Sequence, residues 1–323
     1  MKLLVTGGAG FVGSHLIDRL VNAGHDVVSF DAYESYLSPA SPQYRQYFDH
    51  RLEGLEDDVE FIEGDTRNPI EVAQTVDRVQ PDRIAHLAHL PITGTCEEHP
   101  EAAVDSIVEG TANVLEAAKA TDSVERVLYT SSSMVYGEFQ YDPADEDHPR
   151  NPKGVYGGAK HAGETLTRSF CRSSDLDYTV IRPSAVYGPT DLNRRVSQIF
   201  VERALRGEPL ALHDGGQQVL DFTYIDDTAQ GFDLALTSDA AANETYNITY
   251  GEGRTVAELA AVISEYVDGV ETEVKPVGDF RPKRGALDNS KAREELGFEP
   301  EFSLEEGMKQ YIEFVRSSGA ITE

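Results

Sequence analysis

The first half of the chain alternates short β-favouring segments with stretches of helical periodicity, and this alternation constrains the fold more than any other feature. The β-favouring segments are rich in branched and aromatic side chains, and they span residues 2–6, 26–30, 59–62, 83–87 and 126–130. Between them, apolar residues recur at helical spacing, as in the run from Val12 to Val21. Consecutive strands separated by helices pair in parallel through right-handed crossovers. The pattern therefore predicts an α/β fold in which a doubly wound parallel sheet is covered by helices on both faces.

The second half is less regular and predicts a smaller lobe. Residues 255–258 and 303–306 have the sequence of a capping box, in which a hydroxyl and a carboxylate bond the free amides at a helix start. We expect residues 1–180 to form the first domain, together with a return segment near 220–248. Residues 181–323 then form an irregular α+β lobe, interleaved with the first domain. We expect this lobe over the carboxyl edge of the sheet, where doubly wound folds bind their ligands.

A glycine-rich turn follows the first predicted strand. Gly7, Gly10 and Gly13 are spaced by three residues, and the helical pattern begins beside them. In such a turn the first glycine allows the chain to turn tightly at the end of the strand, the second lets the backbone approach a pyrophosphate, and the third lets the helix pack closely on the sheet. Asp31, 18 residues past Gly13, ends the second strand, where a carboxylate accepts from ribose hydroxyls and repels a 2′-phosphate. The set predicts NAD rather than NADP; a turn that binds nothing is the alternative.

A tyrosine and a lysine in the middle of the chain indicate acid–base chemistry. Tyr156 and Lys160 lie four residues apart, so that a helix presents both on one face. A free phenol has a pKa of about 10, but a nearby ammonium and an oxidised nicotinamide both favour the phenolate. Three serines, residues 131–133, leave the fifth strand at the edge where such sites form, and one hydroxyl can bond the same substrate oxygen. A solvated helix face is the alternative for the Tyr and Lys pair.

The charge balance excludes two classes of partner. The 323 residues contain 57 acidic and 28 basic side chains, which gives a formal net charge of −29. Such a chain repels phosphate backbones and anionic lipid surfaces, so we expect neither a nucleic-acid nor a membrane partner. Because the basic residues are 20 Arg and only 8 Lys, the surface is also suited to a salty cytoplasm. An ordinary acidic and highly soluble protein is the alternative.

No residue spacing indicates a disulfide framework or a metal site. Cys96 and Cys171 are the only cysteines, and neither has a metal-ligand spacing with its neighbours. Asp226 and Asp227 precede a helical pattern, where we expect them to cap the helix rather than to bind a metal. The apolar run at the start of the chain is too short for a signal peptide. We therefore expect a cytoplasmic protein without a metal.

These motifs together resemble the extended short-chain dehydrogenase/reductase family, in its NAD-dependent nucleotide-sugar epimerase/dehydratase branch. The resemblance covers nearly the whole chain through an ordered set of segments, namely residues 6–13, 64–65, 86–88, 110–117, 131–137, 156–160, 182–189 and 221–227. It implies a Rossmann fold with Tyr156 as general base and acid, Lys160 as its activator and ribose ligand, and Ser132 as the catalytic hydroxyl. The cofactor-binding residues that it implies are Gly7, Gly10, Phe11, Val12, Gly13, Asp31, Asp65, Thr66, Leu87, Ala88, Tyr156 and Lys160. Asp65 and Leu87 can also be ordinary strand-end residues.

The two residues after the implied catalytic hydroxyl select among the reactions of the family. Its 4,6-dehydratases carry an Asp-Glu pair there, because eliminating water needs an acid and a base at neighbouring sugar carbons. Here Ser133 and Met134 occupy those positions, which disfavours dehydration and also decarboxylation. We therefore expect an epimerase acting at carbon 4, through transient oxidation to a keto sugar and re-reduction. The alternatives are a dehydrogenase that releases NADH and a non-catalytic dinucleotide-binding sensor or scaffold.

The expected substrate lobe departs from the family pattern. Leu220, Ala185 and Ile107 stand where many relatives have an Arg and two Asn residues. The resemblance then leaves Ser133 beside the sugar, and it leaves the nucleotide diphosphate to three arginines, Arg194, Arg195 and Arg281. A solvated surface pair is the alternative for the first two arginines. The resemblance also implies a homodimer through helices near residues 101–119 and 156–172.

Overall fold

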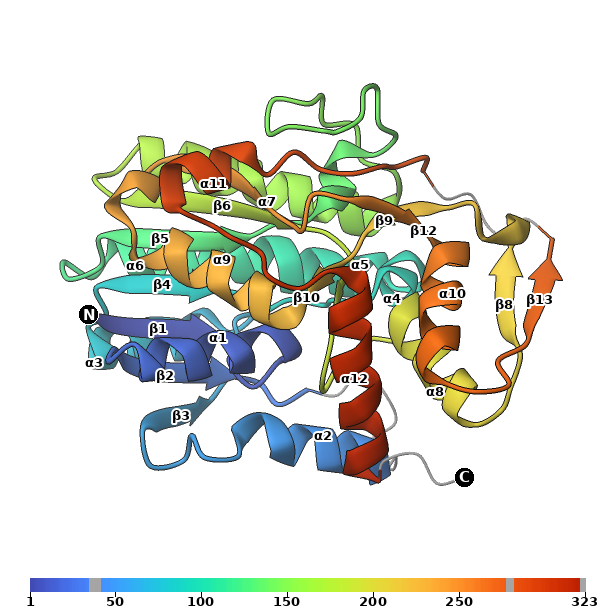
Figure 1. Cartoon of the computed structure of the whole chain (residues 1–323). Coiled ribbons are helices and arrows are strands. Elements are labelled where there is room, and N and C mark those ends of the chain that lie inside the picture. Colours follow the sequence, from blue (N-terminus) through green and yellow to red (C-terminus); the bar gives the residue numbers. More distant parts are fainter. Residues whose placement is uncertain (35–41, 277–281, 320–323) are drawn as a thin grey trace.

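The computed structural model describes residues 1–34, 42–276 and 282–319, and a parallel sheet forms its centre (Figure 1). Within these residues the sheet has seven strands in the order β11-β6-β5-β4-β1-β2-β3. They are β1 (Lys2–Thr6), β2 (Asp26–Asp31), β3 (Val59–Glu63), β4 (Arg83–His86), β5 (Arg126–Thr130), β6 (Asp177–Pro183) and β11 (Glu244–Ile248). The order reverses between β1 and β4, and this switch point opens the crevice in which doubly wound folds bind ligands. The predicted doubly wound parallel sheet is confirmed.

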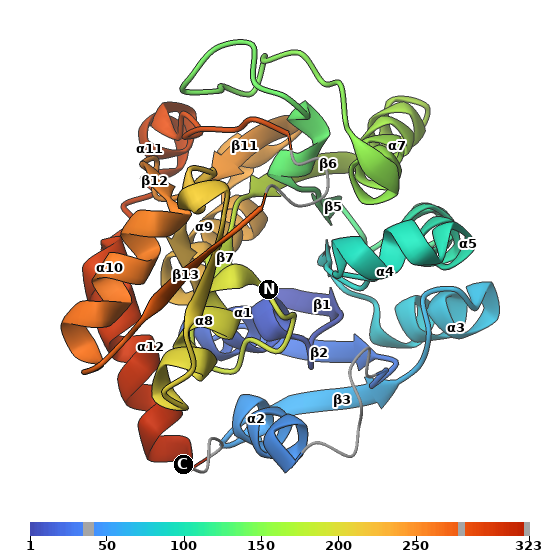
Figure 2. The same cartoon turned by 90° about the vertical axis from the view of Figure 1, so that its right-hand side faces the viewer.

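Helices cover both faces of the sheet, as Figure 2 shows in a view from the carboxyl ends of its strands. One face carries α1 (Phe11–Asn22), α9 (Ile225–Thr237) and α11 (Ser290–Leu296), and the other carries α3 (Pro69–Val79), α6 (Gly110–Lys119) and α7 (Gly154–Arg172). Each layer buries its apolar side chains against the sheet in a separate cluster. The strand β11 pairs with β6 although it comes from the later part of the chain, so the sheet is completed by a return segment. The domain boundary near residue 180 stays a prediction.

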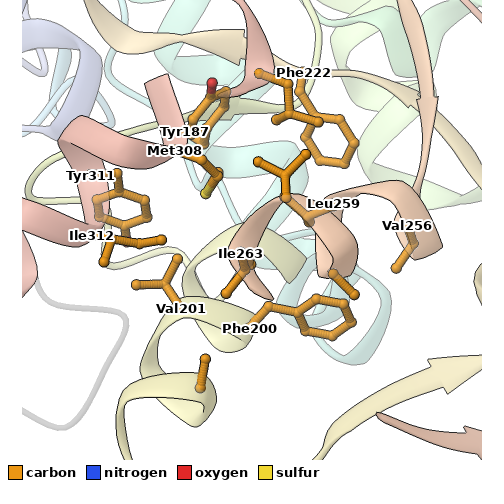
Figure 3. Close-up of a cluster of buried hydrophobic side chains, with 14 of the residues drawn as sticks. Tyr187, Phe200, Val201, Phe222, Val256, Leu259, Ile263, Met308, Tyr311 and Ile312 are labelled. Carbon is orange, nitrogen blue, oxygen red and sulfur yellow. The ribbon is translucent and has the colours of Figure 1, made fainter. Parts of the chain in front are cut away.

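The rest of the second half builds a smaller lobe beyond the carboxyl edge of the sheet (Figure 1). Its strand pairs are β7 (Val186–Tyr187) with β10 (Thr223–Tyr224), β8 (Leu210–His213) with β13 (Thr272–Lys275), and β9 (Val219–Asp221) with β12 (Gly253–Thr255). Its helices are α8 (Val196–Leu205), α10 (Val256–Tyr266) and α12 (Leu304–Ser318). These helices share an apolar core of their own, to which Phe200, Ile263 and Tyr311 contribute from one helix each (Figure 3).

Both predicted capping boxes are present. The hydroxyl of Thr255 accepts from the backbone N–H of Glu258, whose carboxylate accepts in return, and the pair starts α10. Ser303 and Glu306 start α12 in the same way. Because these bonds form within one turn of the chain, the sequence alone could predict them.

The expected cap at residues 226–227 is wrong. Helix α9 begins at Ile225, and Asp227 lies inside its first turn. The carboxylate of Asp227 accepts from the backbone N–H groups of Glu301 and Phe302 at 2.7 and 3.0 Å, so it fixes the chain leading into α12. In the described parts of the chain, no group of three or more His, Cys, Asp or Glu side chains is placed to hold a metal ion. No helix among these residues is both long and apolar enough to cross a membrane.

Candidate active site

A cavity of about 1440 Å³ lies along the carboxyl edge of the sheet, between the two parts of the molecule. The ends of β1, β2, β4 and β5 line one side, and residues 192–197 and 217–220 line the other. Ligand cavities for a single small molecule are about 300–1,000 Å³. The volume therefore suffices for more than one small-molecule ligand.

The glycine-rich turn forms one wall of this cavity. Gly7 has a φ of +74°, and a Cβ there would lie 2.7 Å from the backbone nitrogen of Ala88. A Cβ at Gly13 would lie 2.1 Å from the carbonyl oxygen of Gly7, so neither position accepts a side chain. Gly10 is the N-cap of α1 and offers no side chain to the first amides of the helix. The turn thus has the shape and the amides that a dinucleotide pyrophosphate needs.

The two carboxylates expected beside the adenosine half also line the cavity, in different surroundings. Asp31 accepts from the backbone N–H groups of Ala9 and Tyr33 at 3.0 and 2.8 Å, and burial raises the pKa of its carboxyl against these bonds. Asp65 is half-exposed and is paired with Arg67, whose bonds lower the pKa of the Asp65 carboxyl more than burial raises it. The other expected cofactor residues at this end line the cavity as well, namely Phe11, Val12, Thr66, Leu87 and Ala88.

The expected catalytic residues come together where β5 ends and α7 begins. Tyr156 and Ser132 line the cavity, and a side-chain hydrogen bond links them. Lys160 is fully buried one helical turn after Tyr156, with its Nζ 5.9 Å from the centre of the Tyr156 ring. The Lys160 Nζ donates to the carbonyl oxygen of Thr130 at 2.6 Å. The hydroxyl and the phenol therefore lie at the end of the cavity nearest β5, whereas the Lys160 amine is buried behind them and does not line the cavity.

The electrostatics of the phenol differ from the expectation based on Lys160. Burial raises the pKa of the Tyr156 phenol, and the charge of Arg195 and the hydrogen bond from Ser132 oppose this effect. Burial also lowers the pKa of the Lys160 amine well below its usual value. Of the charges in the polypeptide, Arg195 therefore has the largest effect in favour of the Tyr156 phenolate.

Comparison with known proteins places these features in a family. Residues 3–249 match the family model described as NAD dependent epimerase/dehydratase family. The chain belongs to this family. A UDP-glucose 4-epimerase of Mycolicibacterium smegmatis is 34% identical over 325 residues, which cover 98% of this chain and 99% of the relative.

Solved structures agree with the membership in the epimerase/dehydratase family. The UDP-glucose 4-epimerase of Thermotoga maritima, solved with UDP-glucose, has a TM-score of 0.88 at 31% identity and covers 98% of this chain and 99% of its own. A UDP-glucuronic acid 4-epimerase from Bacillus cereus, in complex with UDP-glucuronic acid and NAD, has a TM-score of 0.89 at 27% identity with the same coverage. The expected family, its enzymatic nature and the Rossmann-like fold are confirmed.

The structure describes two of the three arginines that were expected to hold a diphosphate. Arg194 and Arg195 both line the cavity, Arg194 as an exposed side chain and Arg195 as a half-buried one. The Arg195 Nη1 donates to the carbonyl oxygen of Val186 at 3.0 Å. Arg281 lies outside the described residues. Leu220 is buried and lines the cavity, so it offers an apolar side chain to a ligand there.

Several polar side chains in the cavity were not singled out as site residues from the sequence. Arg284 donates from Nη1 to the Oγ of Ser133 at 3.3 Å, and Ser133 donates to the Oγ of Ser184 at 3.2 Å. A guanidinium therefore lies beside the serine that follows Ser132. The others are Arg51, His89 and Glu97. Arg284 is separated from Ser133 by 151 residues, and nothing in the local sequence distinguishes it from a surface arginine.

A buried ion pair lies behind the catalytic end of the cavity. The Glu164 carboxylate accepts from Nε and Nη2 of Arg182, both at 2.8 Å, and from the Oγ of Ser131 at 2.5 Å. Both members of the pair are fully buried. Glu164 is one helical turn after Lys160, and Ser131 directly precedes Ser132. The pair thus joins α7, β6 and the end of β5, the elements that place the three expected catalytic residues.

We expect Asp31→Ser to weaken the preference for NAD over NADP. The variant loses charge-assisted bonds to a ribose, worth about 1.5–3 kcal/mol, and it removes a charge that repels a 2′-phosphate. NADH affinity should fall about 10- to 100-fold while NADPH affinity rises, as measured by fluorescence titration. Asp26→Ser, at the exposed start of β2, is the matched control. Unchanged affinities for both cofactors in Asp31→Ser would contradict the role of Asp31.

Proposed function

We propose that the protein is an NAD-dependent nucleotide-sugar 4-epimerase. The observation that carries the proposal is the convergence of Ser132 and Tyr156 at one end of a cavity whose wall also contains the glycine-rich turn, with Lys160 buried one helical turn after Tyr156. Membership in the NAD dependent epimerase/dehydratase family supports the cofactor. The full-length similarity to two UDP-glucose 4-epimerases, at 34% and 31% identity, supports the reaction.

The proposed mechanism assigns one task to each catalytic side chain. When bound, NAD supplies reversible hydride transfer. Tyr156 takes the proton of the sugar hydroxyl as that carbon is oxidised, and it returns a proton to the oxygen when the ketone is reduced on its other face. Ser132 holds the same oxygen through its hydroxyl and bonds the phenol. Lys160, held by the Thr130 carbonyl, fixes the position of Tyr156 and offers its remaining donors to a ribose.

The surroundings of Ser132 favour epimerisation over elimination. Ser133 is buried and hydrogen-bonded to Ser184 and Arg284, and no carboxylate stands at residues 133 or 134 to assist loss of water. Glu97 is a carboxylate that lines the cavity, but its Oε1 accepts from the backbone N–H of Val155 at 2.6 Å. This bond holds the Glu97 carboxylate at the start of α7 rather than beside a sugar carbon.

Incubation with nucleotide sugars tests the proposal. We expect UDP-glucose or UDP-glucuronic acid to give the 4-epimer without net NADH. Stoichiometric NADH would contradict the epimerase and support a dehydrogenase. A protein that holds NAD but changes no nucleotide sugar would support a sensor or scaffold, and a protein that holds no NAD would contradict both the cofactor and the reaction.

We also propose that Arg194, Arg195 and Arg281 hold the substrate diphosphate, and Arg195→Ala tests this. The loss of a charge-assisted bond, about 1.5–3 kcal/mol, should raise the KM for the nucleotide sugar about 10- to 100-fold. Because Arg195 also opposes the effect of burial on the Tyr156 phenol, its loss raises the pKa of that base further. The rising limb of the pH–rate profile should then move to higher pH. Arg172→Ala, on α7 and away from the cavity lining, is the control; an unchanged KM in Arg195→Ala would contradict the assignment.

A cytoplasmic homodimer completes the proposal. We propose that the copies meet through the helices near residues 101–119 and 156–172, as the family resemblance implies. Sedimentation should give a dimer, and a monomer alone would contradict it. The net charge of −29 supports adaptation to a salty cytoplasm, which predicts a thermal midpoint that rises in molar KCl.

A further inference from the structure

Arg51 joins the glycine-rich turn to the smaller lobe. It lies in the last turn of α2 (Pro42–Leu52), a helix that lies beside the end of α12 (Figure 1). Its Nη1 donates to the carbonyl oxygen of Ala9 at 3.3 Å, and its Nη2 donates to the carbonyl oxygen of Thr190 at 2.5 Å. Ala9 belongs to the glycine-rich turn, whereas Thr190 lies in the loop between β7 and α8. One guanidinium therefore connects the two walls of the cavity.

The position of this guanidinium matters because of what surrounds it. Arg51 lines the cavity together with Gly10 and Asp31, and the backbone N–H of Ala9 donates to the Asp31 carboxylate. The positive charge of Arg51 opposes the effect of burial on the pKa of two carboxyls, that of Asp31 and that of the fully buried Asp191, which follows Thr190. A dinucleotide with its ribose at Asp31 and its pyrophosphate at the start of α1 would pass next to Arg51. Arginine is suited to this place because its fork of donors binds phosphate oxygens and can keep a carbonyl partner at the same time.

We propose that Arg51 retains the cofactor: it fastens the glycine-rich turn to the loop that carries Thr190 and presents a cation to the NAD pyrophosphate. The inference rests on the proposed epimerase function, which gives retention a purpose. An epimerase must return the hydride to the same sugar, so release of the cofactor between the two transfers would strand the keto sugar. A bridge across the cavity slows that release without touching the reacting atoms.

Cofactor release from the full-length protein tests this role. Wild type, Arg51→Ala and Arg51→Lys are loaded with NADH, and its fluorescence is followed after mixing with excess NAD. We expect release from Arg51→Ala to be about 10- to 100-fold faster than from wild type, the range of a lost charge-assisted bond. Arg51→Lys keeps the charge but not the two-pronged bridge, so its release rate should be intermediate. Arg78→Ala, on α3, breaks an exposed pair with Glu60 on β3; this variant is the control and should match wild type.

The outcomes separate retention from a structural role and from failure of the proposed function. If Arg51→Ala lowers the thermal midpoint of cofactor-free protein while its NADH release rate stays that of wild type, the proposal is overturned. If Arg51→Ala does not fold, an Arg51→Lys release rate equal to that of wild type overturns it as well. If wild type itself binds no NADH, the proposed function fails; if wild type binds NADH and both variants release it equally slowly, only this inference fails.

Discussion

Tyr156→Phe should lower kcat for epimerisation by about 10²- to 10⁴-fold, the usual contribution of a positioned general acid–base. Phenylalanine keeps the ring that lines the cavity but removes the hydroxyl that exchanges the proton. Since the fold and the glycine-rich turn are untouched, the affinity for NADH should change far less than kcat does. The measurements are kcat from the rate of epimer formation, and the dissociation constant of NADH from fluorescence.

Tyr178→Phe is a matched control for this result. Tyr178 is a buried tyrosine at the start of β6, and it does not line the cavity. Its loss of a hydroxyl should leave kcat within about twofold of wild type, because surface and packing changes away from a site act mainly on stability. Wild-type turnover by Tyr156→Phe would remove the phenol from the mechanism and would also weaken the case for Ser132, which bonds it.

The parts of this molecule that could be predicted from sequence are those encoded within one or two turns of chain. The alternation of strands and helices, both capping boxes and the glycine-rich turn depend on neighbours fewer than ten residues away. The four-residue spacing of Tyr156 and Lys160 is equally local, and it correctly places both on one helix face. The spacing does not reveal how deeply each side chain is buried. The complete burial of Lys160 is what lowers the pKa of its amine.

The parts that could not be predicted depend on contacts between distant segments. Arg51 reaches carbonyl groups 42 and 139 residues away, and no local pattern indicates either partner. Asp227 is of a residue type that caps helices and lies in the first turn of α9, yet its carboxylate accepts from amides 74 and 75 residues further along the chain. Asp227 was expected near a helix start, whereas Arg51 was not singled out from the sequence. Tertiary packing decides which backbone groups each of these side chains contacts.

Glu164→Gln should lower the free energy of unfolding by about 3–5 kcal/mol, because it leaves the Arg182 guanidinium buried without a counter-charge. The wild-type carboxylate accepts two bonds from Arg182 and one from Ser131. Gln keeps the shape but not the charge, so the cost comes from the unpaired cation rather than from a cavity. Urea unfolding measures it. The matched control is Glu60→Gln, whose pair with Arg78 is more than half exposed and contributes about 0–1 kcal/mol.

The same pair predicts how stability depends on pH. Burial raises the pKa of the Glu164 carboxyl, but the bonds and charges of Arg182, Arg168 and Ser131 lower it more, from 4.5 to about 2. A carboxyl whose pKa is depressed by folding stabilises the native state above its unfolded pKa. This contribution is therefore present above pH 4.5 and is lost as the pH falls through about 2. Wild type should lose stability over this window more steeply than Glu164→Gln, and parallel curves for the two proteins would mean that the ionised carboxylate of Glu164 does not hold α7, β6 and the end of β5 together.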